Sequence, residues 1–281
     1  MRKHLLYFLL LSAVIFATTC KKNKLKAPTA SFLVVDKVSV NPKSTQGSSS
    51  EKITDIWYYV NGQFQGVFPI GSVMPIATTG NADIQLFAGI KNNGISATRV
   101  PYEFYNPITI NMDLEAGKTY TLSPQFEYKS TAIFTFIDNF EQGSYFQSVG
   151  DSDTVIISDP TKTFGGTGAS LFMSMSDAKP TGKIVNSAAY YLPVGGNPVY
   201  LELNYNCNQA ITVGVIGGGI EERGAITLNS TGGVWNKIYI KLTTVVSTPP
   251  TYEFLGYKVF IKATKEVANP KIYLDNIKLI N

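Results

Sequence analysis

The chain has 281 residues, a formal net charge of +4 and a hydrophobic content of 44%. This length suits about two globular domains, each with its own core. The basic excess lies entirely in residues 1–26, which hold six basic and no acidic side chains, whereas residues 27–281 hold 18 basic and 20 acidic ones. A near-neutral body without a basic stripe argues against nucleic acid as a partner.

The N-terminus has the pattern of an export signal that ends at a cysteine. A basic start precedes the apolar run Leu5–Ala17, which is too short to cross a bilayer as a helix. Small residues then lead to Cys20. The arrangement resembles a bacterial lipoprotein signal, which implies cleavage after residue 19, acylation of Cys20 and anchoring in a lipid bilayer. The alternative is an ordinary secretory signal with a chance cysteine.

Residues 20–30 are expected to form a lipidated tether. Four lysines lie within it, and they can contact anionic head groups at about 1 kcal/mol per charge or remain solvated. In some Gram-negative lipoproteins, acidic residues after the cysteine direct export to the cell surface. Residues 21–24 are Lys-Lys-Asn-Lys. The resemblance therefore implies an outer-membrane lipoprotein and leaves open whether it faces the periplasm or the surface.

The pattern of strands and turns in residues 31–130 predicts an N-terminal β-sandwich of immunoglobulin or transthyretin type, with about seven short strands. Asn61-Gly62 is a strong signal for a two-residue hairpin, because a type I′ turn needs two residues with positive φ. Residues 108–114 and 119–122, with Ala116-Gly117-Lys118 in the turn between them, are expected to form another hairpin. The first half also resembles poorly characterised lipoproteins of Gram-negative bacteria in its segments 56–60, 89–95 and 102–105.

Residues 131–281 predict a second β-sandwich. Apolar and polar side chains alternate over 170–176, 199–205, 238–242 and 257–263, so one face of each strand packs on a core and the other faces away from it. No stretch after Cys20 gives a helical period longer than two turns. The fold class is therefore all-β, with two tandem sandwiches.

The second half resembles carbohydrate-binding modules with a jelly-roll, galactose-binding-like fold. Four cues carry the resemblance, in this order: the segment 137–143, the glycine-rich lead 165–168, the strand opening 234–237 and the exit strand 272–277. The resemblance implies a structural Ca²⁺ held by Glu141, Asp275 and backbone carbonyls near Gly143, since calcium binds six to eight hard oxygens. The alternative is that Asp275 only accepts hydrogen bonds from loop amides.

The inventory of side chains excludes several catalytic classes. His4 is the only histidine and lies in the signal, so Ser-His-Asp and Cys-His catalysis and histidine-ligated zinc are excluded from the mature chain. Once Cys20 is lipidated, Cys207 has no partner for an intrachain disulfide and is expected to be a small buried or half-buried side chain. Paired carboxylates such as Glu141 with Glu202 keep a polysaccharide hydrolase as an alternative.

Aromatic side chains are the remaining candidates for ligand contacts, because rings stack on the apolar faces of sugars. In the second half the ligand-binding candidates are Tyr200, Tyr239, Tyr190, Tyr191 and Tyr145, and in the first half they are Trp57, Tyr59, Tyr102, Phe104 and Tyr105. We therefore expect a membrane-anchored, non-catalytic protein whose jelly roll binds a glycan or a similar extended ligand. The alternative is a structural accessory subunit of a cell-envelope assembly that binds protein partners.

Overall fold

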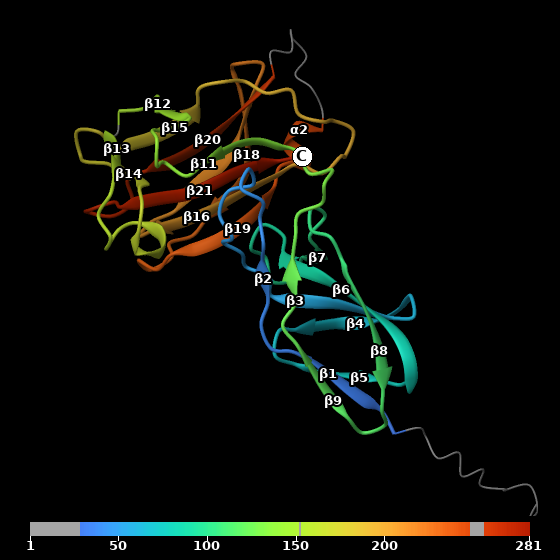
Figure 1. Ribbon diagram of the computed structural model, residues 1–281. Helices are drawn as coiled ribbons and strands as arrows, with labels where there is room; N and C mark the ends of the chain where they lie inside the picture. The colour runs from blue at the N-terminus through green and yellow to red at the C-terminus, as the bar shows by residue number, and fades with distance from the viewer. Residues whose placement is uncertain (1–28, 152, 248–255) are drawn as a thin grey trace, which may run out of the picture.

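The computed structural model describes residues 29–151, 153–247 and 256–281. Cys20, the signal and most of the tether lie outside these residues. Strands make up nearly all of the regular secondary structure of the described residues, which confirms the all-β prediction. Figure 1 shows two β-rich halves, and β1 lies at the end of the first half that is remote from the second. No helix in the described part has the length and hydropathy that a bilayer crossing requires.

Ten strands form the first half: β1 (Ser31–Val35), β2 (Ser39–Val40), β3 (Asp55–Val60), β4 (Gln63–Pro69), β5 (Val73–Ile76), β6 (Gly80–Lys91), β7 (Arg99–Pro101), β8 (Ile108–Leu114), β9 (Thr119–Leu122) and β10 (Gln125–Phe126). The largest sheet has the order β4-β3-β6-β7, with β8 also paired to β6, and a second sheet has the order β5-β1-β9. Asn61 and Gly62 have φ angles of 49° and 74°. The predicted hairpin between β3 and β4 is therefore confirmed.

The predicted hairpin of residues 108–114 with 119–122 is wrong. The chain does turn at Gly117, but β8 pairs with β6 in one sheet, whereas β9 pairs in parallel with β1 in the other. The amide of Gly117 donates to the carbonyl of Ala30, and the amide of Phe32 donates to the carbonyl of Lys118. These bonds draw β9 onto β1, so the strand crosses between sheets instead of folding back on β8.

The second half comprises β11 (Phe134–Asp138), β12 (Phe146–Ser148), β13 (Asp153–Ile157), the 3₁₀ turn η1 (Phe164–Gly166), β14 (Ser170–Ser174), β15 (Thr181–Asn186), β16 (Tyr200–Cys207), β17 (Ile211–Gly217), β18 (Glu221–Leu228), β19 (Asn236–Lys241), α2 (Thr243–Val246), β20 (Tyr257–Thr264) and β21 (Ile272–Ile280). Strands β14 to β21 are divided between two sheets, with the orders β14-β21-β16-β19 and β15-β20-β17-β18. This strand order is that of a jelly roll.

The core of the jelly roll follows the predicted alternation. Side chains from both sheets meet in one buried cluster, which includes Leu201 and Leu203 of β16, Val213 of β17 and Ile261 of β20. Burial of these apolar side chains, at about 25 cal/mol per Å², is the main term that holds the two sheets together. Cys207 is fully buried in this cluster, as predicted.

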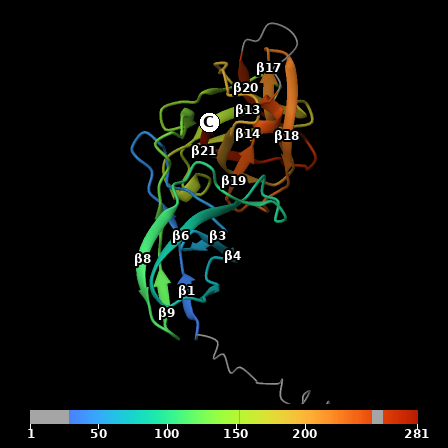
Figure 2. The ribbon, with the colours of Figure 1, turned by 90° about the vertical axis from the view of Figure 1, so that its right-hand side faces the viewer.

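The two halves share a buried contact. Figures 1 and 2 show the first half set against the sheet that contains β16, β19 and β21. Three side chains of the second half, Tyr200, Tyr239 and Ile280, belong to the hydrophobic core of the first half. The turn after β6 also joins β19 through a bridge between Asn92 and Tyr239. The outward face of one jelly-roll sheet is therefore covered by the first half.

Candidate functional site

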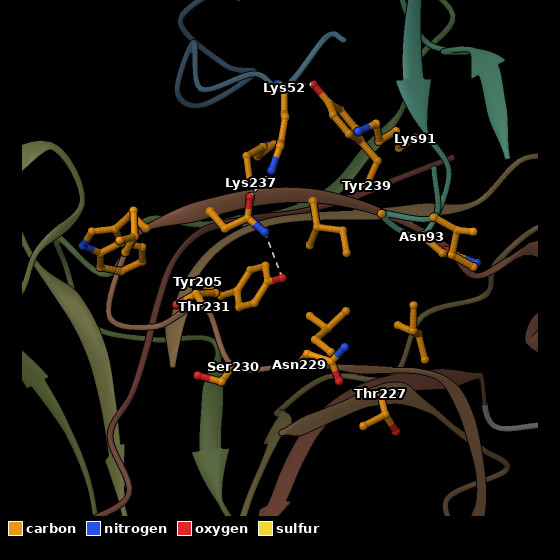
Figure 3. Close-up of a pocket in the computed structure, with 18 of the residues that line it drawn as sticks. Lys52, Lys91, Asn93, Tyr205, Thr227, Asn229, Ser230, Thr231, Lys237 and Tyr239 are labelled. Carbon is orange, nitrogen blue, oxygen red and sulfur yellow. Dashed lines mark hydrogen bonds between the residues drawn. The ribbon is translucent and has the colours of Figure 1, made fainter. Parts of the chain in front are cut away.

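A polar cavity of about 670 Å³ lies between the two halves. Figure 3 shows Lys52 and Lys91 of the first half on one side, with Thr227, Asn229 and Ser230 of the second half opposite them. Hydroxyl and amide side chains form much of the wall: Thr54, Asn93, Asn229, Ser230, Thr231 and Asn236. The cavity is assembled from a loop, the end of β6 and the segment from β18 to β19, so neither half makes it alone.

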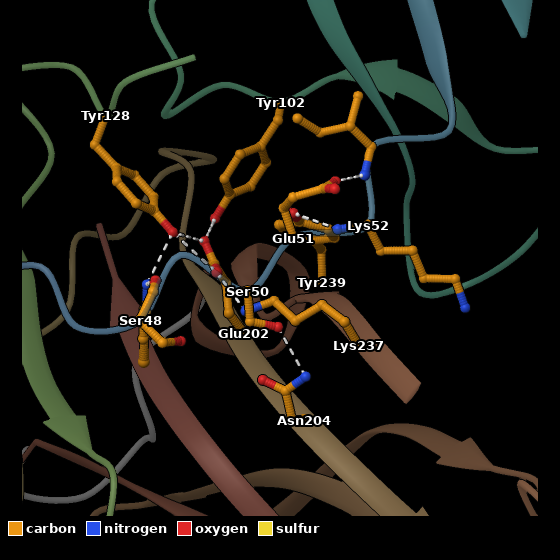
Figure 4. A network of polar contacts seen from close by, with 12 residues as sticks. Ser48, Ser50, Glu51, Lys52, Tyr102, Tyr128, Glu202, Asn204, Lys237 and Tyr239 are labelled. Carbon is orange, nitrogen blue, oxygen red and sulfur yellow. Dashed lines mark hydrogen bonds and ion pairs between the residues drawn. The ribbon is translucent and has the colours of Figure 1, made fainter. Parts of the chain in front are cut away.

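A buried ionic network lies beside this cavity (Figure 4). Glu202 of β16 is fully buried, and Lys237 Nζ donates to its Oε2 at 2.7 Å. The Tyr102 hydroxyl donates to Glu202 Oε1 at 2.7 Å, and the Tyr128 hydroxyl lies 3.0 Å from both carboxylate oxygens. Lys278 Nζ donates to the Tyr128 hydroxyl at 3.2 Å. One carboxylate thus holds groups from both halves.

The two lysines keep Glu202 ionised. Burial would raise the pKa of this carboxyl, but the charges of Lys237 and Lys278 outweigh burial, and its pKa is lowered. Burial lowers the pKa of Lys278 to about 8, against the attraction of Glu202. The network is a structural junction, because Glu202 is enclosed by protein groups and is not open to a substrate.

Tyr200 and Tyr239 are not available as ligand-stacking rings, which corrects the expectation for these two residues. Alternation does place them opposite the jelly-roll core, but they are 0% and 2% exposed. The ring of Tyr102 lies 5.2 Å from that of Tyr200 and 4.7 Å from that of Tyr239. The first half covers this sheet face and buries both rings. Tyr102, Phe104 and Tyr105 are buried in the same contact.

An exposed group of aromatic rings lies on the outward face of the largest sheet of the first half. We call Trp57, Tyr59, Phe64 and Phe87 the aromatic face. Ring centroids are 5.6 Å apart for Trp57 and Phe64, and 5.2 Å apart for Tyr59 with Phe64 and with Phe87. Phe64 is 51% exposed, and the other three rings are half-buried. These are ordinary contact distances for paired rings.

A ladder of polar side chains continues the aromatic face along β6 and β8. Asn81 Nδ2 donates to Asn111 Oδ1 at 2.6 Å and to Asp113 Oδ1 at 3.1 Å. Asn111 Nδ2 donates in return to Asn81 Oδ1 at 2.9 Å and to Asp83 Oδ1 at 2.8 Å. All four side chains are exposed, so amide and carboxylate groups are presented in fixed positions beside the rings.

A cleft of about 810 Å³ opens at the other end of the aromatic face. Tyr59 and Phe87 line it from the first half, together with polar groups of Glu103 and Lys129. The second half closes it with residues that include Pro193, Asn197, Pro198 and Asn281. The aromatic face therefore runs from an exposed amide ladder into a cleft that both halves form.

Two of the other tyrosine candidates of the second half, Tyr145 and Tyr190, lie beside Phe136. The Tyr145 ring lies 6.1 Å and the Tyr190 ring 5.7 Å from the ring of Phe136. Tyr145 is 50% and Tyr191 is 74% exposed. Burial and the nearby Tyr145 raise the pKa of Tyr190. The structure brings Tyr145 and Tyr190 together at the edge of the jelly roll.

The residues named for calcium lie partly together. Burial, aided by the charge of Glu141, raises the pKa of Asp275 to about 6, against hydrogen bonds from Ser170 and from backbone amides. Glu141 Oε1 accepts a bond from the amide of Ala169 at 2.8 Å. Gly143 follows Glu141 in a conformation with φ of 110°. The described residues contain no group of three or more His, Cys, Asp or Glu side chains that could hold a metal.

Sequence reasoning did not name several residues of these sites. Phe87 could have been found, because it shares the outward face of β6 with Gln85 and alternates with buried Ile84 and Leu86. Lys52 and Lys91 carry no sequence signal, since 39 positions separate them and only the fold brings their charges together. Phe64 lies opposite Tyr59 across the hairpin, which the Asn-Gly turn fixes.

No family model matches the chain, and no curated protein matches it. Solved structures resemble about half of it. A family 61 carbohydrate-binding module in complex with β-1,4-galactotriose is 15% identical, with 50% of this chain and 92% of that chain covered and a TM-score of 0.35. A family 4 module is 12% identical (50% and 97% covered, TM-score 0.37). A xylan-binding domain of family 22 is 13% identical (54% and 96% covered, TM-score 0.36).

Proposed function

We propose that the protein is a non-catalytic glycan-binding protein and that the glycan binds along the aromatic face. One observation carries the proposal: four rings lie together on an outward sheet face, between a ladder of amides and carboxylates and a cleft. Rings pack against the C–H faces of pyranoses, and amide and carboxylate groups exchange hydrogen bonds with hydroxyls. The face offers both kinds of contact side by side.

The shape of this face favours an extended ligand. The outward residues from Asn81 to Phe87 cover roughly 20 Å along β6, at about 3.3 Å per residue. An open strip of this length suits a chain of several sugar rings better than a compact small molecule. A second glycan-binding surface is proposed at Tyr145, Tyr190 and Tyr191, at the edge of the jelly roll.

The positions of the acidic residues support binding without catalysis. A glycosidase needs two carboxyl groups about 5–10 Å apart in an open cleft. Glu202 is buried in the junction with Lys237. Glu222 forms ion pairs with Lys183 and Lys262 on the outward face of the other jelly-roll sheet. Glu141 accepts a bond from a backbone amide. The carboxylates of all three glutamates are therefore bonded to other groups of the protein.

We also propose that lipid on Cys20 holds the protein at a bilayer, as an outer-membrane lipoprotein. Ten residues separate Cys20 from β1, a reach of at most roughly 35 Å. Residues of the second half line both the cleft and the cavity. Figure 1 shows the second half at the far end of the first half from β1, so a tether at Cys20 would hold both sites away from the membrane. Mass spectrometry of the native N-terminal peptide tests the anchor, and an unmodified Cys20 would contradict it.

The glycan proposal is tested by calorimetric titration with neutral β-linked oligosaccharides of glucose, xylose, mannose and galactose. We expect at least one series to bind and the Y59A/F64A variant to weaken that binding by about 30-fold or more, since a central aromatic contact contributes about 2 kcal/mol. Y145A/Y191A removes two exposed tyrosines of the second proposed surface, so the same titration distinguishes the two surfaces.

Two results would overturn the assignment to the aromatic face. If only Y145A/Y191A weakens binding, the glycan binds at the edge of the jelly roll. If no oligosaccharide binds and the protein is recovered from envelope extracts with a stable protein partner, the accessory-subunit alternative is correct. Circular dichroism of each variant checks that the strands are retained.

We propose a structural Ca²⁺ beside Asp275, and the residues there fit a cation. Glu141 and Asp275 place two like charges near each other, which favours a cation between them. Thr163 Oγ1 is buried without a hydrogen-bond partner among the described residues, and it immediately precedes Phe164, whose backbone amide faces Asp275. A side chain at Gly168 would collide with the Glu141 carboxylate. Hard oxygens of this kind are calcium ligands.

Calcium is expected to raise the melting temperature of protein that has been stripped with chelator. A cation at 100 times its dissociation constant stabilises the fold by about 2.7 kcal/mol, which corresponds to roughly 5–10 °C at this size. The D275N variant should lose this increment, whereas D177N, at an exposed aspartate on the surface, should keep it. An equal calcium increment in D275N, or none in the unmodified protein, would count against the site.

A further inference from the structure

The lysines that line the polar cavity between the halves are not all balanced by neighbouring carboxylates. Three lysines line it, namely Lys52, Lys91 and Lys237, and no aspartate or glutamate does so among the described residues. Lys237 is neutralised by Glu202, at 2.7 Å, and is near Glu51. Within the described part of the chain, no carboxylate lines the cavity beside the ammonium groups of Lys52 and Lys91.

Lys52 and Lys91 are close enough to affect each other. Burial and the charge of Lys91 both lower the pKa of Lys52, so the two cations repel each other across the cavity wall. Lys52 Nζ donates to Asn236 Oδ1, a neutral acceptor, and this bond holds the ammonium group at the cavity. An anion between the two lysines would relieve their repulsion. Figure 3 shows both side chains on the same side of the cavity.

The rest of the wall suits a hydroxylated molecule. The Asn93 amide, the Asn229 amide and the Ser230 hydroxyl line the cavity. At its rim, Val234 is 69% exposed and is followed by the half-buried Trp235. Amides and hydroxyls can bond sugar hydroxyls, and an aromatic edge can pack on a sugar ring. A bare phosphate or sulfate ion would leave most of this wall without contacts.

We infer that this cavity binds an acidic saccharide, with its carboxylate or sulfate group between Lys52 and Lys91. Charge-assisted hydrogen bonds from lysine to such oxyanions are about twice as strong as neutral ones. The site shares no residue with the aromatic face, so it can exist whether or not a neutral glycan binds there. Each half supplies part of the cavity wall, so the contact between the halves positions the residues that would bind the saccharide.

Calorimetric titration with oligogalacturonate tests the inference, and its fully methyl-esterified form is the uncharged counterpart. We expect the acid to bind at least about tenfold more tightly than the ester, and K52Q/K91Q to remove this preference. The control K37Q/K271Q removes the same charge from two exposed lysines away from the cavity and should bind normally. A sulfated galactan oligosaccharide identifies which anion is preferred, since tighter binding than oligogalacturonate assigns the site to sulfate.

A measurement on the unmodified protein keeps the test independent of how the variants fold. Raising the ionic strength from about 0.01 to 0.1 M shortens the Debye length from about 30 to 10 Å and should weaken binding of the acid. The inference is overturned if the methyl ester binds as tightly as oligogalacturonate, or if neither acidic oligosaccharide binds. It is also overturned if K52Q/K91Q and the control K37Q/K271Q weaken binding equally. Neutral-glycan binding that depends on Tyr59 and Phe64 would be unaffected by any of these results.

Discussion

The E202Q variant is expected to lose about 3–5 kcal/mol of unfolding free energy. Glutamine keeps the size of the side chain but removes the carboxylate charge that Lys237 contacts at 2.7 Å, and it leaves Lys278 less compensated. Both ammonium groups lie in a part of the protein where the side chains are 0–5% exposed, so water cannot replace the lost carboxylate. Urea denaturation followed by circular dichroism measures the change.

The matched control is E222Q, which also separates a glutamate from two lysines. Lys183 and Lys262 are 24% and 43% exposed, so solvent can compensate them, and the expected loss is about 0–1 kcal/mol. A double-mutant cycle adds a second check, because the cost of E202Q should shrink in a K237M background. Additive effects of E202Q and K237M would show that the pair is not coupled as described.

The same network predicts that the two halves unfold together. Lys278 Nζ donates to the carbonyl of Ser48 at 2.7 Å, and Asn204 Nδ2 donates to Ser50 Oγ at 2.8 Å. These bonds tie the loop between β2 and β3 to the second half, and the shared core adds apolar burial. Loss of Glu202 should therefore lower the stability of the whole molecule.

Local sequence patterns predicted the strands and the faces of the jelly roll. Alternation over 199–205 separated Leu201 and Leu203 from Tyr200 and Glu202, and the structure keeps these sets on opposite sides of β16. The Asn61-Gly62 pair predicted a hairpin correctly, because the geometry of the turn depends on two neighbouring residues. Alternation and turn signals each depend on a few consecutive residues, so a single sequence is enough to detect them.

The sequence of a strand does not show which other part of the chain packs against its outward face. Tyr239 alternates as an outward residue would, yet it is buried, because residues about 140 positions earlier pack against it. Glu202 would be read as a solvent-facing carboxylate until its partner Tyr102, 100 residues away, is placed. The pairing of β9 with β1 within the first half also joins segments that are remote in sequence. Contacts this remote depend on tertiary packing within and between the halves, for which local periodicity has no signal.

Above pH 10 the protein is expected to lose stability steeply. Four tyrosines of the junction have pKa values raised well above the usual range, chiefly by burial and also by neighbouring groups: Tyr102, Tyr105, Tyr128 and Tyr239. After burial, the largest contribution to the raised pKa comes from Tyr239 for Tyr105 and from Glu202 for the other three. A tyrosine whose folded pKa is raised stabilises the fold fully below its unfolded pKa of about 10, and this contribution is lost as the pH rises toward the folded value.

Each of these tyrosines can remove about 1.4 kcal/mol of stability per pH unit once it is ionised in the unfolded chain, so four together exceed about 5 kcal/mol per unit. Lys278 acts in the opposite direction. The pKa of Lys278 is about 8 in the folded protein and 10.5 for an unperturbed lysine, so between these values the unfolded chain binds the extra proton and stability rises with pH. The tyrosines outnumber it and dominate above pH 10.

The alkaline transition is measured by following tyrosinate absorbance and circular dichroism together during a pH titration. We expect the exposed tyrosines to titrate first without loss of strand signal, and the buried ones to ionise only in one cooperative step with unfolding. The Y105F variant removes one buried hydroxyl, which lies 3.3 Å from that of Tyr239, and should make the loss of stability above pH 10 less steep. Gradual ionisation of every tyrosine near pH 10 in a folded protein would contradict the burial of the junction, because a tyrosinate beside Glu202 would place two negative charges in a site that water does not reach.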